Sequence, residues 1–381
     1  MLRTTSARLF GTLLGYVILI ILLLTFNPFY FSQPEEFAFS FYGGRRNIIA
    51  NILLFLPVGF LYRLTTGKRG GFLFGALLSL TIELVQFFIP ARTPSVPDIL
   101  ANAAGSWLGA VVHDVLSRRV MITQGMFGRL RLETPLMGLI YLLTPLLWVD
   151  MIAFEEAPGR WLLTVLLGIC GAIIFSNLFR HWWRTINSRI MIYASLAAGS
   201  WFLIGAGAAL LSSIAIPIIA LGMTFLTAML TIIPRSSADR RFERSTLKLL
   251  FPVFGLYLLL LALFFPFRQF DTWHAVFGFT DRIRDNSLQS LFSRVEHLAA
   301  FTAVGYMVAE WRGRLEIPFH KDILRVAFVT MVFALVLEFL SGFQSGRGAS
   351  FVRLVLSVIG GSFGGTIYYM SRAHIRFLLG R

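Results

Sequence analysis

The sequence predicts an all-α protein, a polytopic transmembrane helical bundle of about twelve spans, and three observations support this fold class. Hydrophobic residues make up 56% of the 381 residues and charged residues only 14%, and the mean hydropathy of +0.74 lies far from that of soluble domains. Apolar runs near the ~20 residues that a bilayer core requires recur along the chain. The basic residues stand in short clusters between these runs, as in helices oriented by charge.

Twelve apolar runs are expected to cross the membrane. They lie at 9–26, 48–64, 71–90, 98–115, 134–152, 161–179, 190–211, 214–233, 248–266, 297–311, 323–342 and 351–371. The first run is too long for a signal peptide and no small-residue cleavage site follows it, so we interpret it as an uncleaved helix.

The basic residues predict the orientation. Arg3 and Arg8 precede the first span, which places the N-terminus in the cytoplasm. With alternating spans, the cytoplasmic segments then hold 24 of the 34 Lys and Arg residues, and the C-terminus is cytoplasmic as well. The basic residues behind the net charge of +15 thus follow the predicted membrane topology. No single basic face or tail indicates a nucleic-acid partner.

An internal repeat is predicted, because residues 83–109 align with residues 338–364 at a constant offset of 255. The identical pairs are Glu83 and Glu338, Phe88 and Phe343, Arg92 and Arg347, Ser95 and Ser350, Gly105 and Gly360, and Gly109 and Gly364. Upstream, Phe55, Val58 and Gly59 match Phe301, Val304 and Gly305. We therefore expect three regions: a four-helix unit at 1–115, a central four-helix region at 116–247, and a degenerate parallel copy of the first unit at 248–381.

The first unit resembles a known family. The residues that carry the resemblance are Asn47, Asn51, Phe55, Pro57, Gly59, Ile82–Gln86, Arg92, Asp98, Asn102, Gly105 and Gly109. This series is similar to the VanZ-like family, strongly over residues 26–115 and weakly over 264–371. The resemblance implies a multi-pass protein of the bacterial cytoplasmic membrane with a cell-envelope function. The family's namesake is associated with resistance to the glycopeptide teicoplanin, but the resemblance implies no particular reaction.

Polar residues of this unit predict an outward-facing pocket. Glu83 and Gln86 share one helix face, as do Asp98 and Asn102 on the next helix, and ionisable residues at membrane depth are functional candidates. The candidate ligand-binding residues are Asn51, Glu83, Gln86, Arg92, Asp98 and Asn102. The expected ligand is lipid-linked or part of the cell wall or an exopolysaccharide.

Three other interpretations of this cluster stay open. The polar groups would serve helix packing alone, or Glu83 and Asp98 would act as acid and base on a lipid-linked envelope precursor, or the protein would be a transporter. The aromatic loop at 27–46 would cover the pocket or anchor in the interface.

Small residues at helical spacing predict close helix approach instead of a site. They are Gly59, Ala101, Gly105, Gly109, Gly360 and Gly364. No spacing in the chain resembles a zinc or nucleotide site, so no metal or cofactor is expected, and the lipid bilayer is the expected partner.

Overall fold

The computed structural model confirms the predicted all-α class. It describes residues 2–27, 29–34, 37–90, 92–119, 136–151, 160–182, 188–206, 214–233, 242–263, 270–276, 288–313, 319–345 and 348–378. The chain divides into two compact units, one formed by Met1–Gly128 with Phe279–Leu291 and Met370–Arg381, the other by Arg129–Gly278 and Phe292–Tyr369. The three-region division expected from the sequence stays a prediction.

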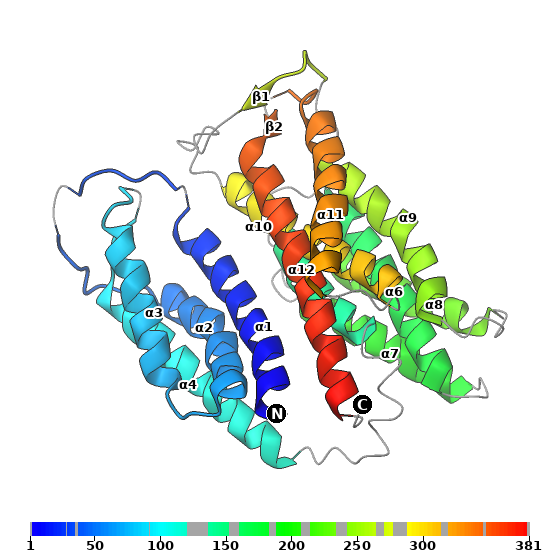
Figure 1. Ribbon diagram of the computed structural model, residues 1–381, viewed down its shortest axis with the longest axis horizontal. Helices are drawn as coiled ribbons and strands as arrows, with labels where there is room; N and C mark the ends of the chain where they lie inside the picture. Colours follow the sequence, from blue (N-terminus) through cyan, green and yellow to red (C-terminus); the bar gives the residue numbers. More distant parts are fainter. Residues whose placement is uncertain are drawn as a thin grey trace. The chain divides into compact units, whose positions relative to one another are not determined.

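The described residues form twelve helices that correspond to the twelve predicted spans (Figure 1). The first unit contains α1 (Leu2–Thr25), α2 (Arg45–Thr66), α3 (Gly71–Gln86) and α4 (Val96–Arg119). After the helix Leu136–Met151 come α6 (Trp161–Trp182), α7 (Ser188–Gly205), α8 (Ala215–Ile232), α9 (Phe242–Ala262), α10 (Leu288–Arg312), α11 (Phe319–Ser341) and α12 (Phe351–Leu378). Seven of the described helices are long and apolar enough to cross a membrane on their own composition.

Backbone contact between α2 and α4 holds the first unit together. A Cβ atom at Gly105 would overlap the carbonyl oxygen of Ile52, and one at Gly109 would overlap that of Leu56. In the reverse direction, Gly59 faces the backbone of Ser106. Small residues let membrane helices approach this closely because no side chain separates their backbones. The apolar core of the unit lies beside this contact and is centred on Ile21, Phe55, Val58 and Ile82.

The helix α3 is shorter than the run that predicted it. The apolar run extends to Pro90, but the helix ends at Gln86, where Ile89 N–H bonds the Gln86 carbonyl oxygen at 2.9 Å. Proline has no N–H and disfavours helical geometry at the residue before it, so the helix cannot continue through Pro90. Glu83 therefore lies within one turn of the end of α3.

Buried charge extends α10 beyond its predicted limit. The apolar run begins at residue 297, whereas the helix begins at Leu288, because it continues through the buried residues Arg294 and Glu296. Glu296 pairs with Arg160, which precedes α6, at 2.7 Å between Arg160 Nη2 and Glu296 Oε1. Asp150 is buried at the same place, 3.8 Å from the Arg160 guanidinium. The second unit thus encloses an ion cluster drawn from three separate segments.

Two short strands of the second unit were not predicted. β1 (Ala275–Val276) pairs in parallel with β2 (Ala349–Ser350), so that Val276 lies opposite Ser350. The first unit has a matching parallel bridge between Ser40 and Ser95. In both units this pairing ties a loop to the residues that open α4 or α12.

Candidate functional site

The candidate site of the first unit lies where α3 ends and α4 begins, a region called here the α3–α4 junction (residues 83–102). Glu83 is only 3% exposed, and its Oε2 accepts the backbone N–H of Ser95 at 2.8 Å. Ser95 immediately precedes α4, and the first N–H groups of a helix have no partner within it. A carboxylate is also favoured at the positive end of a helix dipole. The local role of Glu83 is thus to cap α4.

Gln86 and Arg92 bind the end of α1. Gln86 Nε2 donates to the Thr25 carbonyl oxygen at 3.0 Å. Arg92 donates from Nε to the Asn27 carbonyl at 3.1 Å and from Nη2 to the Leu24 carbonyl at 3.0 Å. The last carbonyl groups of a helix lack partners within it, so both side chains complete α1. Burial lowers the pKa of Arg92, an effect opposed by the nearby Glu83 carboxylate.

Asp98 and Asn102 lie one turn apart on α4. Asn51 of α2 interacts with the side chain of Asp98, and Asn102 Nδ2 donates to Ser79 Oγ of α3 at 2.8 Å. Each residue also holds a buried oxygen, Asp98 Oδ1 and Asn102 Oδ1, without a hydrogen-bond partner among the described residues. These two acceptors are unusual, because buried polar atoms are normally paired.

The structure therefore brings most of the predicted residues together in one place. Glu83 interacts electrostatically with both Asp98 and Arg92, and Asn51 reaches Asp98 from the neighbouring helix. Gln86 and Arg92, however, direct their donors towards backbone carbonyls of α1. The spacing of the residues indicated the cluster. It did not indicate that Gln86 and Arg92 would bind the end of α1.

A cavity of about 390 Å³ opens beside the junction. It is lined by Ser32, Gln33, Pro34, Ala38, Phe87, Ile89, Pro90, Arg92, Thr93 and Pro94. Of the six predicted ligand-binding residues, only Arg92 reaches it. The loop after α1 forms one wall and is fixed to the α3–α4 connection by backbone hydrogen bonds from Ser32 to Phe88 at 2.8 Å and from Ser40 to Pro94 at 2.7 Å. Glu35 and Glu36 of that loop lie outside the described residues.

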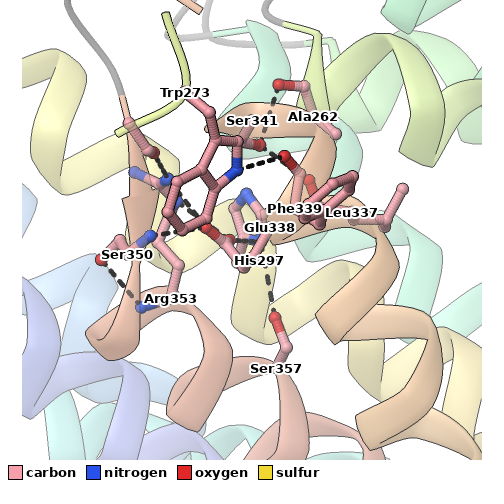
Figure 2. A network of polar contacts seen from close by, with 11 residues as sticks. Ala262, Trp273, His297, Leu337, Glu338, Phe339, Ser341, Ser350, Arg353 and Ser357 are labelled. Atoms are coloured by element: carbon pink, nitrogen blue, oxygen red, sulfur yellow. Dashed lines mark hydrogen bonds and ion pairs between the residues drawn. The ribbon is translucent and has the colours of Figure 1, made fainter. Parts of the chain in front are cut away.

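The second unit contains a comparable junction between α11 and α12, shown in Figure 2. Glu338 Oε2 accepts the backbone N–H of Ser350 at 2.8 Å. Arg353 donates to the same carboxylate from Nε at 3.1 Å and from Nη2 at 2.8 Å. His297 Nδ1 lies 3.9 Å from Glu338 Oε1 and 3.4 Å from Ser357 Oγ. Arg347 lies outside the described residues.

Comparison with known proteins relates the first unit to a protein family. A family model described as VanZ/LLP1 matches residues 13–117. Residues 13–117 form a VanZ-like domain. Protein VanZ of Enterococcus faecium is 28% identical over 85 residues, which are 22% of this chain and 53% of that protein. The match thus spans about half of the length of this relative, and no solved structure matches the chain.

The VanZ-like domain contains all six predicted ligand-binding residues, since they lie between positions 51 and 102. It also contains the α2–α4 backbone contact and both ends of the α3–α4 junction. The second junction, at Glu338, lies outside the matched residues.

Proposed function

We propose that this chain is an envelope protein of the bacterial cytoplasmic membrane whose VanZ-like domain binds a lipid-linked or cell-wall ligand at the α3–α4 junction, on the outer side of the membrane. One observation carries the proposal: Asp98 and Asn102 each hold a buried oxygen that no described residue hydrogen-bonds. An unpaired buried acceptor costs free energy, and a ligand that donates hydrogen bonds recovers that cost. The binding residues are Glu83, Asp98 and Asn102, with Asn51 supporting Asp98.

Part of the polar cluster is accounted for by helix packing alone. Gln86 and Arg92 satisfy carbonyl groups of α1, and the amide nitrogen of Asn102 links α4 to Ser79. These contacts favour a structural role for Gln86 and Arg92. The proposed ligand-binding function therefore rests on the acceptors that remain on α4.

The contacts of Glu83 favour binding over acid–base catalysis. Its side chain is buried and one carboxylate oxygen already accepts the Ser95 N–H. A general acid or base must reach the proton that it transfers, and a carboxylate used to cap a helix is poorly placed to move. We therefore prefer a binding protein to an intramembrane enzyme.

The similarity to Protein VanZ of Enterococcus faecium supports a link to glycopeptide resistance, with teicoplanin as the first compound to test. In this proposal the VanZ-like domain changes how an envelope component is presented at the outer leaflet. The share of the relative that is matched, 53%, makes this link a proposal for the VanZ-like domain and not for the whole chain.

Single alanine substitutions at Asp98 and Asn102, with Glu83→Gln, test the proposal in a susceptible host that expresses the full chain. The readouts are teicoplanin susceptibility and protein level in the membrane. Asp114→Ala is the matched control, because Asp114 lies on the same helix but outside the junction. It pairs with Arg63, at 2.8 Å between Arg63 Nε and Asp114 Oδ1. Loss of resistance at normal protein level for Asp98 and Asn102, but not for Asp114, is expected. Unchanged resistance in all four variants would overturn the proposal.

Binding and catalysis are separated by a second measurement. The purified full chain is incubated with total envelope lipid and examined by mass spectrometry. Intact lipid that co-purifies with the wild type and is lost in Asp98→Ala supports binding. A chemically altered lipid, formed by the wild type and not by Glu83→Gln, would establish an enzyme instead.

A further inference from the structure

In both junctions a buried glutamate carboxylate accepts a hydrogen bond from the backbone N–H of a serine. Ser95 N–H bonds Glu83 Oε2 at 2.8 Å, and Ser350 N–H bonds Glu338 Oε2 at 2.8 Å, and in each case the donor follows the acceptor by twelve positions. Both serines also stand opposite a residue of a preceding loop in a parallel bridge or strand pair. The same backbone path therefore presents a buried glutamate at the start of α4 and at the start of α12.

The helices around the two junctions are in the same register. Gly105 meets the carbonyl of Ile52 as Gly360 meets that of Leu298, and Gly109 meets that of Leu56 as Gly364 meets that of Thr302. The offset is 255 residues on α4 and α12 and 246 residues on α2 and α10. Equivalent positions in the two junctions can thus be compared residue by residue.

The junctions differ in charge at one equivalent pair, Asp98 and Arg353, each three residues after its serine. Arg353 binds Glu338 through two N–H groups (Figure 2). It also donates to the Gly348 carbonyl. In the first unit, Asp98 adds a second carboxylate next to Glu83. Arg92, whose charge acts on Glu83, has two of its N–H groups on backbone carbonyls of α1.

We propose that Arg353 marks, within the same chain, the kind of group that the α3–α4 junction binds: a cation that donates hydrogen bonds, such as a primary ammonium or a guanidinium. This inference rests on the proposed function and names its ligand class. Two neighbouring carboxylates of like charge are stabilised by a cation placed between them. A primary ammonium has three donors, and Glu83, Asp98 Oδ1 and Asn102 Oδ1 supply three acceptors on adjoining faces of α3 and α4.

The exposed fractions of these three residues indicate the side from which a cation would enter. Asp98 is partly exposed, whereas Glu83 is 3% exposed and Asn102 is 5% exposed. A cation carried on a flexible stem can therefore enter past Asp98 and place its charge against Glu83. The amine of a phospholipid headgroup and the amine of a soluble molecule share this chemistry, and the experiment distinguishes them.

The test compares three phospholipids by native mass spectrometry of the full chain in detergent. Phosphatidylethanolamine carries a primary ammonium, phosphatidylcholine carries a cation without N–H donors, and phosphatidylglycerol carries no amine. A lipid source predicts at least tenfold preferential retention of phosphatidylethanolamine. A soluble source predicts no lipid preference but a rise in melting temperature with millimolar ethylammonium chloride. Neither effect in the wild type would overturn the inference.

Asp98→Arg is the decisive variant, because it copies the Arg353–Glu338 pair into the first unit. Loss of the phosphatidylethanolamine preference, or of the ethylammonium shift, at an unchanged melting temperature is expected. Retention of either effect at full strength would overturn the inference.

Arg353→Gly keeps the inference testable if Asp98→Arg does not fold. Removal of the internal cation exposes the Glu338 carboxylate, and millimolar ethylammonium is expected to raise the lowered melting temperature of this variant further than that of the wild type. An equal rise in both would contradict a cation-accepting junction. Should Asp98→Ala abolish resistance while no ammonium probe binds, the ligand class is wrong and the proposed function stands.

Discussion

The guanidinium of Arg160 lies 2.7 Å from the carboxylate of Glu296, and both side chains are buried, at 8% and 1% exposure. Removing one partner of a buried ion pair leaves an uncompensated charge, which typically costs about 3–5 kcal/mol. Arg160→Ala is therefore expected to lower the stability of the second unit by about that amount. Thermal unfolding of the purified protein in detergent measures the loss.

Arg325→Ala is the matched control for Arg160, because Arg325 is exposed on α11. Its melting temperature should stay within the error of the wild type. An Arg160→Ala variant as stable as this control would show that Asp150 and Glu296 do not depend on the guanidinium.

The α2–α4 backbone contact predicts that a larger side chain at Gly105 disrupts the first unit. Gly105→Leu is expected to prevent accumulation of the protein in the membrane, because a side chain at Gly105 would displace the Ile52 backbone. Overpacking of a well-packed site commonly costs about 1–3 kcal/mol. Membrane levels measured by immunoblot give the result. Gly255→Leu on α9 is the control, since apart from the adjacent backbone of its own helix no described residue comes within 4 Å of a Cβ placed there. Equal levels of the two variants would contradict the contact.

Arg92 should stabilise the first unit through α1. Each of its two hydrogen bonds carries a charge on the donor, and such bonds contribute about 1.5–3 kcal/mol. Arg92→Ala is expected to destabilise the unit and to raise hydrogen exchange in the last turn of α1. Arg69→Ala, at an exposed position, should do neither. If exchange in α1 does not change, Arg92 acts on a ligand and not on the helix.

The predicted orientation can be tested by cysteine labelling, because the single native cysteine, Cys170, is buried at 1% exposure. A cysteine introduced at Thr93 should react with a membrane-impermeant maleimide in intact cells. One introduced at Lys68 should react only after the cells are opened. The wild type, which has Cys170 alone, serves as the unlabelled control, and the reverse pattern would invert the topology.

Most of the fold could be predicted because lipid imposes a simple rule on sequence: a span needs an apolar run of sufficient length. The rule failed at helix ends. It placed the start of α10 at residue 297, since Arg294 and Glu296 interrupt the apolar run, although both are buried. Partners on neighbouring helices can stabilise a buried charge, and hydropathy along the sequence does not detect such partners.

The proximity of several candidate residues could be predicted from the sequence, but their contacts could not. Helical periodicity placed Glu83 beside Gln86 and Asp98 beside Asn102. It could not reveal that Gln86 reaches the Thr25 carbonyl, because that contact depends on where α1 ends in space. The exchange of Asp98 for Arg353 was visible in the sequence, but its meaning required the Arg353–Glu338 pair that the structure shows.

The hydrogen bonds that complete α1 also imply an order of assembly during synthesis. Gln86 and Arg92 donate to carbonyl groups that precede them by 61 to 68 residues. When α1 leaves the ribosome, the residues that will bind its last turn have not yet been translated. The first helix can therefore enter the bilayer early, but its C-terminal turn acquires these protein donors only after the α3–α4 connection has been made.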